Sequence, residues 1–139
     1  MGLSIRNQLT ATVLAITSGE AMATVKARLS GGREITAAIT REAVEDLALA
    51  EGSEVRVLVK STEVSLATGE IDGISIRNQL PGTVAGIAAG GAMAAVKVAV
   101  DGGELTAAVT KEAVDELGLS TGTPVVALVK STEISLATA

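Results

Sequence analysis

The sequence predicts an all-β fold, mainly strands, made of two tandem barrel modules that each have five strands and one short helix. Three observations support this prediction. The same pattern runs through the chain twice, and in each copy one helical segment stands among runs with the spacing of strands. In addition, 47% of the 139 residues are hydrophobic, yet there is no Phe, Trp or Tyr. A module with such small core side chains buries little area, so we expect further burial between modules or between chains.

The repeat divides the chain into two copies. The hexapeptide Ser4–Leu9 recurs unchanged at Ser75–Leu80, and Leu58–Thr68 recurs at Leu128–Thr138 with one difference. The offset between matching residues falls from 71 to 70 near Arg33, where one residue is lost. We therefore expect a first module at 1–68, a Gly-flanked linker at 69–73 and a second module at 74–139.

The elements within a copy follow from local patterns. Thr40 is placed to cap a helix, with Glu42 in its first turn, and the helix should bury Val44 and end before Gly52. Runs rich in Val, Ile, Leu and Thr predict the strands at 12–16, 24–29, 34–39, 55–60 and 64–66. A short helix between the third and fourth of five strands is the chain order of an OB-like barrel. Closing such a barrel removes exposed strand edges.

The residue types that are missing exclude several functions. The chain has no His and no Cys, which removes zinc fingers, iron–sulfur clusters, disulfides and Ser–His–Asp or Cys–His catalysis. A net charge of −5 and the lack of aromatic residues oppose binding to nucleic acid. Because no nucleophile–base pair or paired acid is visible, we expect neither an enzyme nor a cofactor.

A membrane span and a secretory signal are not expected either. The uncharged run from Asn78 to Val96 contains Pro81 and four glycines, and Thr83–Ile87 within it has the pattern of a strand. No basic segment followed by an apolar stretch opens the chain. Together with the absence of Cys, this is compatible with a cytoplasmic protein.

A polar cluster opens each copy. Arg supplies a fixed fork of N–H donors, Asn and Gln supply amide donors, and Ser supplies a hydroxyl. Such a set suits a tetrahedral oxyanion, although a polar strand start with solvated side chains is the alternative. Retention in both copies while neighbouring residues diverged gives the two interpretations nearly equal weight. The cluster consists of Ser4, Arg6, Asn7 and Gln8, and in the second copy of Ser75, Arg77, Asn78 and Gln79.

A second cluster follows the fourth predicted strand. It runs from Lys60 to Glu63 and recurs from Lys130 to Glu133, with Ser61 and Ser131 after the lysines. The ammonium groups could point into a pocket, or the lysines could simply protect a strand edge. The glutamates are not expected to be ligands, because a carboxylate repels an oxyanion.

Thr40 and Thr110 mark the predicted helix starts and form the third cluster. A helix N-terminus presents free N–H groups and a partial positive charge, although for the threonines alone simple capping is the favoured explanation. The three clusters together could hold a dianion through charge-assisted bonds without a metal. The negative net charge does not forbid this, because the potential at a site is local.

These segments resemble the Mop, or molybindin, family of molybdate-binding modules. The resemblance rests on the SIRNQL opening, the Ala-Ile-Thr before the short helix and the LVKSTEVSLAT ending, and it covers nearly the whole chain twice. Ile5 and Ile76 depart from the Ala of the usual SARNQL opening without changing the donor set. A tandem pair resembles the di-Mop cytoplasmic binders. This implies binding of molybdate or tungstate, without another cofactor, for intracellular storage or homeostasis.

The resemblance also implies an assembly and a set of site residues. Tandem members form homotrimers with six modules, and anion sites lie at interfaces between modules. Further sites lie near the three-fold axis, where the turns Gly19–Met22 and Gly90–Met93 are candidates. The implied oxyanion-binding residues are Ser4, Arg6, Thr40, Lys60, Ser61, Ser75, Arg77, Thr110, Lys130 and Ser131, with Asn7, Gln8, Asn78 and Gln79 expected to add backbone or structural bonds.

Other readings of the chain remain open. No GxxxxGK[ST] motif is present, unlike in the transporter ATPases that carry this module. We therefore expect a free-standing binder without a nucleic-acid or membrane partner. The main alternative is a ligand-free structural or interaction module of OB-like barrels, and fold alone does not decide between the two. An OB-type nucleic-acid binder is disfavoured by charge and composition.

Overall fold

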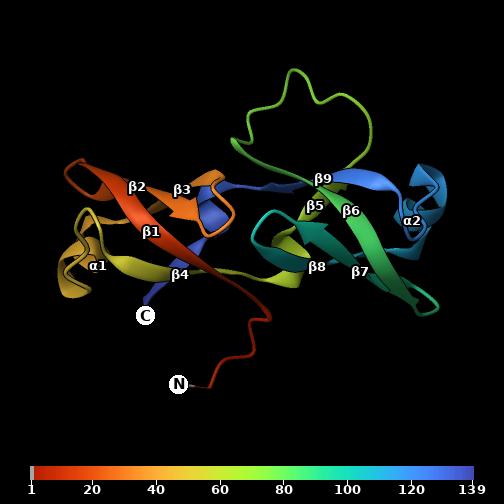
Figure 1. Ribbon diagram of the computed structural model, residues 1–139, viewed down its shortest axis with the longest axis horizontal. Coiled ribbons are helices and arrows are strands. Elements are labelled where there is room, and N and C mark those ends of the chain that lie inside the picture. Colours follow the sequence, from red (N-terminus) through yellow and green to blue (C-terminus); the bar gives the residue numbers. More distant parts are fainter. Residues whose placement is uncertain (1) are drawn as a thin grey trace.

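A computed structural model describes residues 2–139 and confirms the mainly β architecture (Figure 1). The first copy contains β1 (Asn7–Ser18), β2 (Met22–Leu29), β3 (Glu34–Thr40), α1 (Arg41–Asp46), β4 (Glu54–Val59), the 3-10 helix η1 (Ser61–Glu63) and β5 (Ser65–Ala67). The second contains β6 (Asn78–Ala89), β7 (Met93–Val100), β8 (Gly103–Thr110), α2 (Lys111–Leu117), β9 (Pro124–Val129), the 3-10 helix η2 (Ser131–Glu133) and β10 (Ser135–Thr138).

The last strand of each copy belongs to the sheet of the other copy. The two five-stranded sheets have the orders β10-β4-β1-β2-β3 and β5-β9-β6-β7-β8, with antiparallel neighbours. Ser135 of β10 lies opposite Leu58 of β4, and Ser65 of β5 lies opposite Leu128 of β9. The boundary expected at 69–73 divides the sequence repeat, but each sheet combines four strands of one copy with one strand of the other.

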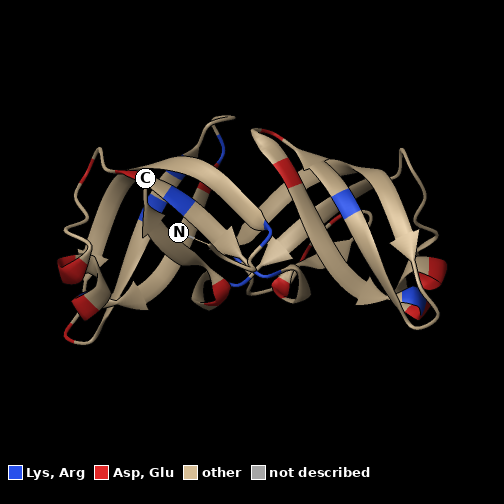
Figure 2. Ribbon diagram, turned by 90° about the horizontal axis from the view of Figure 1, so that it is seen from below, with Lys and Arg blue, Asp and Glu red and all other residues tan. Residues whose placement is uncertain are grey.

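Both sheets curl into half-barrels that stand side by side, as Figure 2 shows. Each long first strand carries a bulge, between Val13 and Ala15 in β1 and between Val84 and Gly86 in β6. A bulge bends a strand and increases its twist, so these positions help the sheet to close on itself. The burial of β2 alternates strictly along its length, which gives the sheet one core-facing side and one outward side.

The aliphatic core continues from one copy into the other. Leu9 and Val59 of the first copy share a buried cluster with Leu80, Val129 and Ile134 of the second. The burial expected between modules therefore takes place within a single chain. It adds apolar area to a core without aromatic side chains, at about 25 cal/mol for each Å² removed from water.

Two glycine turns meet where the copies join. A Cβ atom added to Gly31 would lie 2.5 Å from the backbone carbon of Asp101, and one added to Gly102 would lie 2.6 Å from the Gly31 nitrogen. The hydroxyl of Ser30 also lies 3.4 Å from the Gly102 carbonyl oxygen, as a hydrogen-bond donor. The turns β2–β3 and β7–β8 can approach this closely only because these positions lack side chains.

The structure refines the local predictions. Thr40 caps α1 as expected, with its hydroxyl accepting a hydrogen bond of 3.1 Å from the Ala43 amide. The helix ends at Asp46, well before Gly52, because the chain turns at Ala48 into the left-handed region with φ 51°. The short helices η1 and η2 were not predicted, since three residues are too few for a periodic pattern.

The uncharged run in the second copy forms strands. Asn78–Val96 covers β6, a turn and the first part of β7, so the predicted strand Thr83–Ile87 lies inside β6. Within residues 2–139, no helix has the length and apolar character needed to cross a membrane.

We predict that Ala48→Gly stabilises the protein. Ala48 has φ 51°, whereas its counterpart Gly118 reaches φ 62° without strain. Relief of this strain outweighs the extra backbone entropy of glycine in the unfolded chain, so the free energy of unfolding should rise by about 0.5–1 kcal/mol. Chemical denaturation measures the change. Gly118→Ala is the matched control and should destabilise; an unchanged or lower stability of A48G would contradict the prediction.

Candidate functional site

The opening segment of each copy is bent by its own arginine. The Arg6 guanidinium donates from Nε to the Ser4 carbonyl at 3.2 Å and from Nη2 to the Leu3 carbonyl. Arg77 does the same, with 3.0 Å to the Ser75 carbonyl and a second bond of 2.6 Å to the Ile74 carbonyl. Both arginines are exposed, and a guanidinium has further N–H groups beyond the two used here. Each segment therefore presents a positioned, solvent-facing cation.

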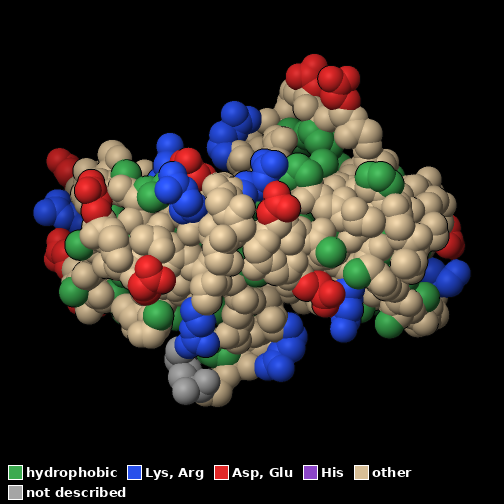
Figure 3. All heavy atoms as spheres, viewed as in Figure 1, with side chains coloured by type: hydrophobic (Ala, Val, Ile, Leu, Met, Phe, Trp, Pro, Cys, Tyr) green, Lys and Arg blue, Asp and Glu red, His purple; other side chains and the backbone are tan. Residues whose placement is uncertain are grey.

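The two opening segments lie on opposite edges of the molecule. In Figure 1 the N-terminal segment runs below the sheets and the linker before β6 runs above them. Figure 3 shows Lys and Arg side chains beside both segments. Each edge therefore carries its own group of cations, one for each copy.

The asparagines of the opening motif hold the two copies together. Asn7 is 3% exposed, its Nδ2 donates to the Thr106 carbonyl at 2.8 Å, and its Oδ1 accepts from the Thr106 amide at 2.7 Å. Asn78 is equally buried and forms the same pair of bonds with Thr36, both 2.8 Å. The resemblance places these amides among the site residues, with backbone or structural bonds as their expected contribution. In the structure both amides bind the backbone of the other copy.

The glutamines also bind backbone. Gln8 donates from Nε2 to the Ile5 carbonyl at 3.0 Å, and Gln79 donates to the Ile76 carbonyl at the same distance. Gln8 has a second partner, because its Oε1 accepts a bond of 3.0 Å from Nη1 of Arg56. The glutamine amides therefore hold the backbone of the opening segments. Any contribution to the site is made through this backbone and not through a direct bond to an anion.

Lys60 and Lys130 precede η1 and η2, where the end of each copy crosses to the sheet of the other copy. η1 packs against β8 and η2 against β3, so these helices lie between the half-barrels at the centre of the molecule (Figure 2). Both lysines are exposed, and Ser61 and Ser131 are half-buried. The strand exchange thus brings the Lys-Ser clusters of the two copies to one region.

A small cavity lies between the second opening segment and the Lys-Ser cluster of the second copy. Its volume is about 110 Å³, and Lys130 shares its wall with Ile76 of the opening motif and with residues of η1. Glu63 and Glu133 also line it, and their negative charge counters that of the lysine. An anion at this place needs cations beyond Lys130.

The helix-start threonines are not brought to the centre. α1 and α2 lie at the two outer ends of the molecule (Figure 1), and the Thr40 and Thr110 hydroxyls each accept a capping bond of 3.1 Å. The surface beside Thr40 includes Glu20, Glu42 and Glu45, which weakens an anion site there. Within one chain, the third predicted cluster is therefore separate from the other two.

The cations of the first two clusters are electrostatically available. The ion pairs within 4.0 Å among residues 2–139 are Arg28–Glu34, Arg41–Glu45 and Lys111–Asp115. None involves Arg6, Arg77, Lys60 or Lys130. An incoming anion would therefore not have to displace a carboxylate from any of these four groups.

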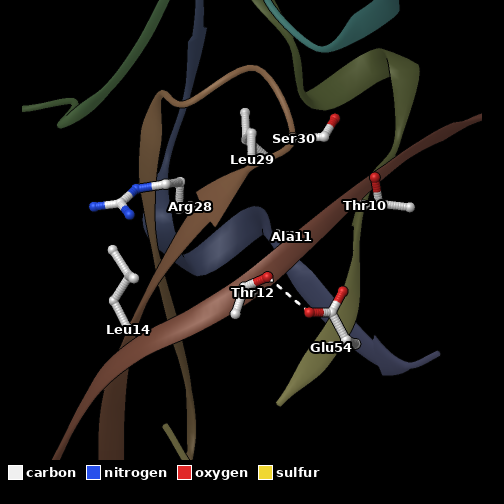
Figure 4. A pocket seen from close by; sticks show the side chains of 8 residues that line it. All are labelled: Thr10, Ala11, Thr12, Leu14, Arg28, Leu29, Ser30 and Glu54. Carbon is white, nitrogen blue, oxygen red and sulfur yellow. Dashed lines mark hydrogen bonds between the residues drawn. The ribbon is translucent and has the colours of Figure 1, made fainter. Parts of the chain in front are cut away.

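A larger cavity lies on the outward side of the first sheet and was not predicted. It measures about 340 Å³ and is lined by Arg28, Glu54, Thr12 and neighbouring residues of β1 and β2 (Figure 4). The Thr12 hydroxyl donates to Glu54 at 2.8 Å. The second copy has a cavity at the equivalent place, lined by Pro81, Gly82 and Pro124. The repeat replaces Arg28 by Ala99 and Glu54 by Pro124, so only the charged lining is particular to the first copy.

Comparison with known proteins identifies the family. The TOBE domain matches residues 3–66 and 74–136, which is most of each copy. The chain belongs to the TOBE-domain family. Its relatives include the molybdenum-pterin-binding protein MopA of Rhodobacter capsulatus, 38% identical over an alignment of 141 residues that covers 99% of this chain and 52% of MopA. The molybdenum transport protein ModE of Azotobacter vinelandii is 38% identical over 138 residues, 99% of this chain and 51% of ModE.

The tandem TOBE chain spans about half the length of the curated relatives it matches. A solved structure matches it from end to end. The cytoplasmic molybdate-binding protein ModG, in a crystal form with molybdate bound, superimposes with a TM-score of 0.96 and 40% identity over 100% of both chains. These matches confirm the resemblance to the Mop family and the tandem OB-like fold.

We predict that Asn7→Ala destabilises the fold of the tandem TOBE chain. The substitution removes two hydrogen bonds and leaves the half-buried amide and carbonyl of Thr106 without these partners. The free energy of unfolding should fall by about 2–4 kcal/mol, measured by urea denaturation. Gln8→Ala, at an exposed neighbour, should cost less than about 1 kcal/mol. Equal losses for N7A and Q8A would argue against a stabilising role of the bonds between Asn7 and Thr106.

Proposed function

We propose that this protein binds molybdate, and also tungstate, as a free oxyanion for storage or homeostasis in the cytoplasm. The observation that carries the proposal is the end-to-end match to ModG, a protein crystallised with molybdate bound. The relatives that match this chain in sequence are named as binding, transport or import proteins of molybdenum. The proposed role is accordingly binding and not catalysis.

The chemistry of the retained residues fits a tetrahedral dianion. Arg6 and Lys60 supply positive charge and have no carboxylate partner within 4.0 Å in the described part of the chain. Ser4 and Ser61 add hydroxyl donors. The second copy offers Arg77, Lys130, Ser75 and Ser131 in the same roles. Charge-assisted hydrogen bonds of this kind are short and strong, so a metal ion or cofactor is not needed.

We further propose that the sites are completed in a homotrimer of six modules. One chain leaves Thr40 and Thr110 at its outer ends, far from the central cations. Beside these threonines the chain exposes apolar surface: Met22, opposite Thr40 in the sheet, is 48% exposed, and Met93, opposite Thr110, is 49% exposed. An exposed methionine at the same place in both copies suits a contact with another chain.

The alternative is a ligand-free interaction module. The same exposed methionines would serve assembly in that case, and the cations would be solvated surface groups. Thermal melting separates the two functions, because only an anion binder is stabilised selectively by its anion.

We expect molybdate and tungstate to raise the melting temperature in a concentration-dependent way. A ligand that binds only the folded state contributes about 2.7 kcal/mol at a hundred times its Kd. Differential scanning calorimetry in constant ionic strength measures the shift. Sulfate and phosphate at the same concentrations are the controls and should have smaller effects. A melting temperature that does not respond to molybdate or tungstate would favour the interaction module.

We expect the double variant Arg6→Ala/Arg77→Ala to bind molybdate about 10- to 100-fold more weakly. Each site then loses one charged hydrogen-bond donor, which contributes about 1.5–3 kcal/mol. Isothermal titration calorimetry measures the affinity. Arg28→Ala is the matched control, because Ala99 already occupies this place in the second copy. If R6A/R77A bound as tightly as R28A, the arginines would not belong to the site.

A further inference from the structure

The two copies hold their opening segments differently. In the first copy Arg56 of β4 donates from Nη1 to Oε1 of Gln8 at 3.0 Å, and Gln8 in turn donates to the Ile5 carbonyl. In the second copy Gln79 makes the same bond to the Ile76 carbonyl, but the counterpart of Arg56 is Val126. A valine has no polar group to offer the glutamine. The first copy therefore has one more hydrogen bond in this chain, from Arg56 to Gln8 to the Ile5 carbonyl, than the second copy has. We call this chain of bonds the brace.

The brace ends next to two residues that are proposed to bind the anion. Ile5, whose carbonyl Gln8 holds, stands between Ser4 and Arg6 in the sequence. Arg56 limits the rotamers of Gln8, because it ties the amide oxygen while the amide nitrogen is bound to the segment. Groups that are held in their binding geometry before the ligand arrives lose less entropy on binding.

The positive charge of Arg56 should also favour anion binding beside the opening segment of the first copy. Arg56 is half-buried and has no carboxylate within 4.0 Å among residues 2–139. It lies opposite Thr10 in the β1–β4 ladder, whereas Glu54 lies opposite Thr12, one side-chain pair further from the opening segment. The second copy has Val126 and Pro124 at these two places. At this position of the strand, a positive charge is thus particular to the first copy.

We propose that Arg56 is a positioning residue that makes the two anion sites of the chain unequal. The site that uses Ser4 and Arg6 then binds the dianion more tightly than the site that uses Ser75 and Arg77. This inference rests on the proposed molybdate-binding function and adds a residue that the repeated motif does not contain.

The experiment isolates each site with the arginine variants. In an Arg77→Ala background the first-copy site dominates binding, and Arg56→Val should weaken it about three- to fivefold, the effect of one partly exposed charged hydrogen bond. In an Arg6→Ala background the same R56V substitution should leave the affinity unchanged. Titration calorimetry with sodium molybdate on the full chain provides the values.

Two further variants separate positioning from general stability. Arg56→Lys keeps a charged donor for Gln8 and should retain most of the affinity in the R77A background. Val126→Arg should strengthen the second-copy site in the R6A background by a similar factor, a gain that loss of stability cannot produce. Valine is already the residue at the equivalent position of the second sheet, so R56V is expected to fold, and its melting curve checks this.

The outcomes distinguish this inference from the proposed function. If R56V had no effect in the R77A background, or weakened binding equally in both backgrounds, the role of Arg56 would be overturned while molybdate binding stood. If the unmodified chain bound no molybdate, the proposed function itself would fail.

Discussion

Each sheet of this protein is completed by the last strand of the other copy, and the remaining features of the structure follow from that exchange. β10 covers the exposed side of β4, and β5 covers that of β9. A copy that kept its own last strand would have to close a core of Val, Leu, Ile and Ala by itself, and small domains with small side chains gain little from burial. Sharing strands merges the two cores into continuous apolar packing across the junction.

The same exchange determines where the polar chemistry lies. The chain leaves β4 and β9 through η1 and η2, so the Lys-Ser clusters of both copies come to the junction. The opening motifs reach the junction as well, because Asn7 binds the β8 backbone and Asn78 binds the β3 backbone. The opening motifs and the Lys-Ser segments, which stayed alike in the two copies, therefore both lie at the junction. A substitution there disturbs two sheets at once, whereas a substitution on an outward face disturbs one sheet.

The outward faces show how far the copies have diverged. The first sheet carries Arg28, Glu54 and Arg56, and the second carries Ala99, Pro124 and Val126 at the same places. The groups proposed to bind the anion are the same in both copies, so any difference between the proposed sites comes from such neighbours. Fusion of the copies allows this, because one chain can carry two environments that a single repeated module could not.

Local patterns in the sequence determined the two copies, the alternation of most strands, the threonine caps and the type of donors available for an anion. Each of these depends on residues that are close in the chain. The sequence did not determine the role of Asn7, the separation of Thr40 from the central cations, or the bond from Arg56 to Gln8, since each joins or separates distant segments. Above all, it could not decide which sheet the last strand joins. The two copies end in nearly the same residues, so a strand makes the same ladder of backbone bonds with either sheet, and only the path of the chain through the tertiary structure selects one.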